Sequence, residues 1–110
     1  MAAKTITLIY DDKEYTLEFN RKTIRQMERQ GFVARNIEDM PMSMVMSLFS
    51  GAFLMHHRNI TETEIEKIYA SIRDKEDFLA KLSEMYSEPV IALMDEPAED
   101  EGNAMWEASW

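Results

Sequence analysis

The chain contains no cysteine, and this absence excludes disulfides, thiolate catalysis and cysteine-ligated zinc. Glycine and proline are scarce, with three of each, and the glycines are isolated from one another. The sequence therefore lacks a Gly-rich phosphate-binding loop and a Gly-x-Ser-x-Gly nucleophile elbow. Its most apolar window, residues 40–55, is interrupted by Pro41 and Gly51 and is too short to span a bilayer. Because no secretion signal is visible either, we expect a soluble, cytosolic domain.

Basic side chains are nearly absent from the last third of the sequence. Residues 1–75 hold 11 basic and 11 acidic side chains, whereas residues 76–110 hold 1 basic and 10 acidic ones. The whole formal net charge of -9 therefore lies in this last third. A net negative field repels phosphate backbones, so we expect no nucleic-acid partner.

The start of the chain alternates between apolar and polar side chains and predicts a β-hairpin over residues 5–19. Apolar side chains recur at every second position on both sides of a polar stretch, which is the period of a half-buried strand. A turn centred on Asp12 and Lys13 would place Tyr10 opposite Tyr15 and gather the apolar pairs on one face. A four-residue loop in the same register is the alternative.

After residue 19 the hydrophobic period changes to that of α-helices. The spacing predicts helices over residues 21–30 and 42–58, a third beginning at Thr61, a fourth from about Asp74 to a break before Pro89, and a short fifth over residues 87–94. Asn20, Gly31 and the capping box of Thr61 with Glu64 supply the start and stop signals. The predicted fold class is α+β and mostly α: an N-terminal hairpin followed by a compact bundle of four to five helices. We expect one globular domain over residues 1–94 and an acidic tail over residues 95–110, here called the tail segment.

No group of side chains in the sequence has the spacing of a catalytic or metal site. His56 and His57 are adjacent, so on a helix they point about 100° apart and do not converge on one ion. No HxxxH or ExxH spacing surrounds them, so histidines at the surface or at a helix end are the simpler interpretation. We expect a non-enzymatic protein with no catalytic residues, no cofactor and no metal.

Methionine is abundant, with 10 residues, and four of them recur two apart at Met40, Met42, Met44 and Met46. One interpretation is an adaptable apolar surface for varied partners, because unbranched methionine side chains repack easily. The other is a buried core helix in a small bundle. Since this helix is apolar on several sides, self-association would help a domain of this size to cover it.

The tail segment carries six acidic residues, no basic one, and both tryptophans of the chain, Trp106 and Trp110. An acidic composition alone is typical of a disordered tail. Tryptophan, however, is the side chain best suited to anchoring an interface. The tail segment therefore either docks on its own domain or serves as a linear motif for a partner.

Several segments carry a likeness to known proteins: KTITLIY from Lys4 with KEYTLEF from Lys13, MERQGF from Met27, FSGAFLMHH from Phe49, EPVIALMDEP from Glu88 and GNAMWEASW from Gly102. With these segments the chain resembles small tail assembly chaperones of long-tailed bacteriophages and prophages. The resemblance covers essentially the whole chain.

The resemblance implies a role in viral tail assembly. Such proteins bind the long, helical tape-measure protein, keep it soluble, help to recruit tail tube subunits around it, and are absent from the finished virion. It also implies self-association along the tape measure and a location in the bacterial host cytoplasm. On physical grounds we expect the partner to contact apolar side chains of the second predicted helix and of the tail segment: Met42, Met46, Phe49, Phe53, Trp106 and Trp110.

Two other classes of function stay open at this point. A structural virion component, such as a tail completion protein, would remain in purified particles. An acidic inhibitor of a host protein would need its acidic side chains spread over a folded face, whereas in this sequence they cluster towards the tail segment.

Overall fold

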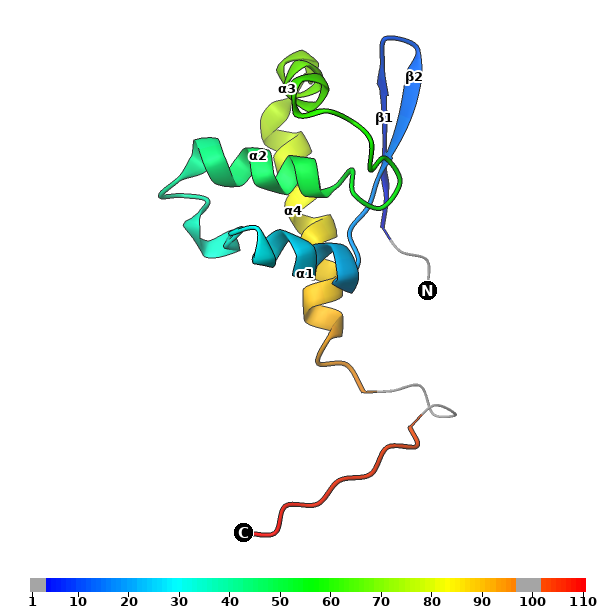
Figure 1. Cartoon of the computed structure of the whole chain (residues 1–110), viewed down its shortest axis with the longest axis vertical. Helices are drawn as coiled ribbons and strands as arrows, with labels where there is room; N and C mark the ends of the chain where they lie inside the picture. The colour runs from blue at the N-terminus through cyan, green and yellow to red at the C-terminus, as the bar shows by residue number, and fades with distance from the viewer. Residues whose placement is uncertain (1–3, 97–101) are drawn as a thin grey trace.

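The computed structural model describes residues 4–96 and 102–110. Within them, an N-terminal hairpin precedes four α-helices and one short 3-10 helix, η1 (Ala34–Asn36), which confirms the predicted α+β, mostly α fold (Figure 1). Helix α4 runs behind α1 and α2, and the hairpin stands beside the helices. The predicted domain and tail segment also include residues 1–3 and 97–101, which lie outside the described residues.

The strands β1 (Ile6–Tyr10) and β2 (Lys13–Leu17) pair antiparallel, but their register differs from the predicted one. Tyr10 lies opposite Lys13 rather than opposite Tyr15. Each residue of β1 thus pairs with a β2 residue two positions earlier than predicted. Because this shift is even, every side chain stays on its predicted face of the hairpin.

The turn of the hairpin explains the corrected register. Asp11 and Asp12 form it, with φ angles of 52° and 63°. Two successive residues with positive φ are typical of a type I′ turn, whose twist matches that of the flanking strands. Aspartate tolerates this conformation better than most residues, so the tighter turn forms one residue before the predicted centre.

The outer edge of β2 is covered by the connection between α2 and α3. The backbone N–H of Thr16 donates to Nε2 of His57 at 3.0 Å, and the N–H of Glu18 donates to the carbonyl of Ala52 at 3.1 Å. Backbone groups at a sheet edge that would otherwise need water are therefore paired, and the hairpin is held against the helices.

Helix α1 (Arg21–Arg29) begins and ends at the predicted signals. The side chain of Asn20 accepts from the N–H of Thr23 at 2.8 Å, and the Thr23 hydroxyl accepts from the N–H of Asn20 at 3.0 Å. At the other end, Gly31 has a φ of 98°, and the N–H of Phe32 donates to a carbonyl of the last turn at 3.0 Å. This is a Schellman ending, with Phe32 buried as its hydrophobic contact.

Helix α2 (Pro41–Gly51) is shorter than the predicted helix over residues 42–58. The carbonyl of Ala52 accepts from the N–H of Glu18 in the hairpin. In a continued helix the same carbonyl would accept from the N–H of His56. Packing against the hairpin thus ends the helix early, and tight turns follow it.

Gly51 allows α1 and α2 to approach closely. A Cβ atom at this position would lie 2.3 Å from Sδ and 2.8 Å from Cγ of Met27. Met27 is itself buried, with 2% of its surface exposed, so its side chain would have to shift to admit a Cβ. Glycine is therefore favoured at this position by packing between the helices rather than by backbone conformation.

Helix α3 (Glu62–Ser71) begins at the predicted cap. The Thr61 hydroxyl accepts from the N–H of Glu64 at 3.2 Å. The Glu64 carboxylate accepts from the same hydroxyl at 3.2 Å instead of reaching the backbone of Thr61. The N-cap therefore forms as predicted, without the second half of the capping box.

Helix α4 (Lys75–Ala92) runs through Pro89, so the predicted fourth and fifth helices are one. Pro89 has no N–H to donate to the carbonyl of Met85, and such a proline costs about 3 kcal/mol in a helix interior. Tertiary contacts hold the helix on the N-terminal side of the proline, where Met85 is buried and the carboxylate of Glu88 lies 3.2 Å from Nζ of Lys4.

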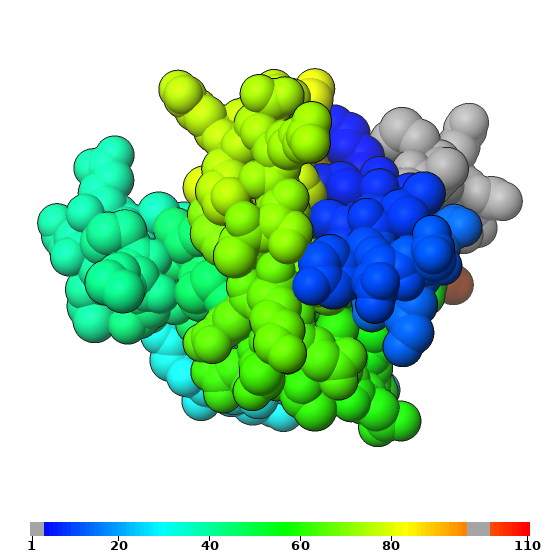
Figure 2. All heavy atoms as spheres, turned by 90° about the horizontal axis from the view of Figure 1, so that it is seen from above, coloured from blue at the N-terminus to red at the C-terminus, as the bar shows by residue number. Residues whose placement is uncertain are grey.

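The core lies where the hairpin meets α2, α3 and α4. The ring of Phe49 packs edge to face on those of Phe53 and Tyr69, with centroids 5.0 and 5.4 Å apart. Seen from above, α3 separates the hairpin from the connection between α1 and α2 (Figure 2). The largest fully buried apolar side chains come from all of these elements: Leu17, Phe49, Phe53, Ile68 and Leu82.

Candidate functional site

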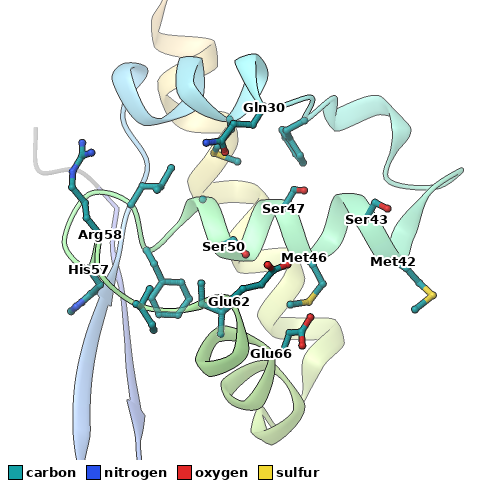
Figure 3. Close-up of a pocket in the computed structure, with 17 residues that line it drawn as sticks. Gln30, Met42, Ser43, Met46, Ser47, Ser50, His57, Arg58, Glu62 and Glu66 are labelled. Carbon is teal, nitrogen blue, oxygen red and sulfur yellow. The ribbon is translucent and has the colours of Figure 1, made fainter.

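An open groove of about 730 Å³ follows the outer side of α2 (Figure 3). The end of α1, the start of α3 and the connection between α2 and α3 form its other walls. In Figure 3, Ser43 and Ser47 project from α2 toward the side of α1, and Met46 projects toward α3. The groove is thus an elongated surface on one helix, bounded by two others.

Methionine side chains supply much of the apolar surface of the groove. Met42 is 89% exposed, Met46 is half-buried, and Met27 lies buried at the base. Met42 and Met46 are four residues apart, which places them one above the other on the same face of α2. Their unbranched side chains can adapt to apolar groups of different shapes.

The charged side chains of the groove lie along its α3 wall and at the end near the α2–α3 connection. Glu62 and Glu66, one turn apart on α3, are both exposed and face the groove next to Met46. Arg58 lies at the other end, beside His57. The α3 wall therefore carries negative charge, which favours a partner with basic side chains on that side.

Arg58, Glu62 and Glu66 were not identified as site residues from the sequence. They belong to the α2–α3 connection and to α3. In the sequence, their spacing indicates only that they are exposed to solvent, not that they line a groove. They line the groove because α3 packs beside α2, which is a tertiary contact without a local signal in the sequence.

The structure places Phe49 and Phe53, two of the predicted partner contacts, in the core. Phe49 is 0% and Phe53 is 1% exposed. Phe53 reaches the inner wall of the groove, whereas Phe49 packs among other aromatic rings. Phe49 lies on the side of α2 that faces the domain and Phe53 follows the end of the helix, and both are too deeply buried to offer an exposed surface.

Of the other predicted contacts, Met46 is half-buried and the remaining three are exposed. Met42 and Met46 lie together in the groove, whereas the tryptophans of the tail segment do not take part in it. Trp106 is 87% and Trp110 is 104% exposed. The tail segment is thus not docked through these side chains on its own domain.

The two adjacent histidines bind different residues near the hairpin. Nε2 of His57 accepts from the N–H of Thr16, so that nitrogen is unprotonated and the proton of the neutral ring lies on Nδ1. Nε2 of His56 lies 2.9 Å from the carboxylate of Glu18. His57 therefore has a structural role that the sequence did not reveal.

The perturbed pKa values belong to groups on α4 and at the N-terminus, away from the groove. The hydrogen bond from Lys4 holds the pKa of Glu84 below its usual range, and Glu84 together with Glu88 raises the pKa of Lys4. Burial raises the pKa of Tyr86, and the nearby charge of Glu28 adds to this effect. These groups tie α4 to the rest of the domain.

Neither a metal cluster nor a membrane-spanning helix occurs within residues 4–96 and 102–110. In this part of the chain, no three histidine, aspartate or glutamate side chains are grouped as a metal ion would require. No helix among the same residues has the length and apolar character needed to cross a membrane.

No curated protein and no solved structure matches the chain significantly. One family matches, over residues 1–110. The chain therefore belongs to the family DUF5055, described as a domain of unknown function.

Proposed function

We propose that the chain is a tail assembly chaperone of a long-tailed bacteriophage or prophage. In this role it binds the tape-measure protein, keeps it soluble and assists assembly of the tail tube without enzymatic chemistry. The observation that carries the proposal is the methionine-lined groove on α2, which lies open beside a well-filled core.

The groove has the properties of a surface that binds helices. An amphipathic helix presents an apolar stripe at every third or fourth residue, and such a stripe fits an apolar groove between helices. Met42 and Met46 extend the apolar surface along α2. Because methionine adapts to different neighbours, one groove can accept many successive segments of a long helical protein.

The charged side chains of the groove favour one orientation of the bound helix. Glu62 and Glu66 form one wall, so a helix with basic residues along one flank of its apolar stripe is favoured. Exposed charge pairs of this kind contribute up to about 1 kcal/mol each and mainly select among partners. The apolar contacts supply most of the affinity.

Co-expression with the tape-measure protein tests the proposal. We expect the tape-measure protein to become soluble and to co-purify with the full chain. Met42→Glu should weaken the complex about tenfold to a hundredfold, because burial of a methionine side chain contributes about 1.5–3 kcal/mol. Met42 is 89% exposed, so this change should leave the fold intact.

Ile9→Glu provides a matched control. Ile9 is 73% exposed on the hairpin and does not line the groove, so this variant should bind as the wild type does. An insoluble tape-measure protein, or equal loss of binding in both variants, would contradict the proposal. Mass spectrometry of purified particles gives a second criterion, since a structural virion component would be present there and a chaperone absent.

A further inference from the structure

The exposed face of α1 is basic. Arg21, Arg25 and Arg29 follow one another at intervals of four residues and therefore lie along one side of the helix. Lys22 lies beside them, and all four side chains are exposed. Glu28 is the one exposed acidic residue of this helix. Within residues 4–96 and 102–110, the ion pairs found involve Lys4 and His56 only, so the basic side chains of α1 form none.

An exposed apolar patch adjoins this basic face. At the end of α4, Ile91 is 68%, Leu93 is 62% and Met94 is 85% exposed. The start of α1 lies beside this end of α4 (Figure 1), and Nη2 of Arg21 donates to the carbonyl of Ala92 at 3.2 Å. Together, the basic side of α1 and the apolar end of α4 form one continuous surface, here called the α1–α4 surface.

The tail segment has the complementary chemistry. It carries six acidic residues and no basic one. Its apolar side chains are uncovered: Met105 is 92%, Trp106 is 87% and Trp110 is 104% exposed. Acidic groups would pair with the arginines of α1, and the tryptophans would cover the apolar end of α4 or stack on guanidinium groups.

We infer that the tail segment of one copy of this chain binds the α1–α4 surface of a second copy. We take a second copy as the occupant because the acidic tail segment complements the basic α1–α4 surface and the single chain leaves Trp106 and Trp110 exposed. The two contacting surfaces are different, so the interface is heterologous and each bound copy still offers a free surface or a free tail segment. The chains therefore associate head to tail into a ring or an open row.

Tryptophan fluorescence reports on the tail segment alone, because it contains both tryptophans of the chain. With the full chain, we expect the emission maximum to move to shorter wavelength as the protein concentration rises, in parallel with the mass measured by light scattering. Both changes should reverse in 1 M salt, where the Debye length falls to about 3 Å.

A charge exchange between two full-length variants tests the pairing directly. The first variant reverses the charge of the exposed face of α1 with Lys22→Glu, Arg25→Glu and Arg29→Glu. The second variant replaces the six acidic residues of the tail segment by lysine. Each variant alone should be at least tenfold weaker in self-association than the wild type. Mixed in equal amounts, they should associate again, because the acidic helix of one now faces the basic tail of the other.

Lys67→Glu with Arg73→Glu is the matched control, since these exposed basic residues lie outside the α1–α4 surface, and it should associate as the wild type does. A mixture of the two charge variants that stays monomeric would overturn the inference. Short-wavelength emission that is independent of protein concentration would also overturn it, because it would show that the tail segment docks on the domain of its own chain. Binding to the tape-measure protein uses the groove on α2, so failure of either proposal leaves the other testable.

Discussion

Replacing Gly51 by alanine tests the packing that brings α1 against α2. The new Cβ would lie 2.3 Å from Sδ, 2.6 Å from Cε and 2.8 Å from Cγ of Met27. These distances are far below ordinary contact, and Met27 is only 2% exposed. The side chain of Met27, which lies between the core and the base of the groove, must therefore change its rotamer.

The expected cost follows from two opposing effects. Forcing an extra methyl group into a packed interior costs about 1–3 kcal/mol. Alanine in place of glycine in a helix gains about 0.5–1 kcal/mol, because the unfolded chain loses less entropy. Gly51→Ala should therefore lower the free energy of unfolding by up to about 2.5 kcal/mol, and each 1 kcal/mol should lower the Tm by about 4–8 °C for a domain of this size.

A double-mutant cycle separates the clash from other effects. Urea unfolding gives the free energies for Gly51→Ala, for Met27→Ala and for both changes together. Met27→Ala removes all three atoms that the new Cβ meets, so in its background Gly51→Ala should be neutral or stabilising. If Gly51→Ala costs the same in both backgrounds, or stabilises the wild type, the packing argument is wrong.

Three further predictions concern single contacts. His57→Ala removes the acceptor of the Thr16 N–H and should cost about 1–3 kcal/mol in urea unfolding, whereas His57→Gln should recover part of the loss. Asn20→Ala removes the cap of α1 and should cost about 0.5–2 kcal/mol by the same measurement, with Asn20→Asp close to the wild type. The pKa of Glu84 lies below its usual range because Lys4 donates to it, so the stability from this pair is complete above the ordinary glutamate pKa and is lost as the pH falls through the lowered value. Lys4→Met should return the pKa of Glu84 toward its ordinary range in an NMR titration, and an unchanged pKa would contradict the assignment.

Local signals in the sequence were sufficient for the N-terminal hairpin followed by helices and for the boundaries of α1 and the start of α3. Asn20 and Thr61 cap helices as predicted, and Gly31 ends α1 in the expected left-handed conformation. These signals act within a few residues, through hydrogen bonds to neighbouring backbone groups. They therefore depend little on the rest of the fold.

The features that the sequence did not reveal depend on distant contacts. The early end of α2 requires the N–H of Glu18 to reach the carbonyl of Ala52 from the hairpin. Helix α4 continues through Pro89 although the proline removes one backbone hydrogen bond, and the residues before it contact distant parts of the chain. Local periodicity contains neither fact.

The candidate site was only partly predictable, because it too depends on contacts between distant parts of the chain. The methionine pattern identified Met42 and Met46, but the apolar character of α2 on several sides did not reveal which side faces the core. Phe49 therefore appeared as a surface contact although it is fully buried. The glutamates of the α3 wall became recognisable only once α3 was placed beside α2.

The most direct measurement of the central claim is co-purification of the tape-measure protein with the full chain and with its Met42→Glu and Ile9→Glu variants. The account predicts a soluble complex for the wild type and Ile9→Glu, and a complex weakened about tenfold or more for Met42→Glu. A tape-measure protein that stays insoluble with every variant, or that binds Met42→Glu as well as the wild type, would contradict it.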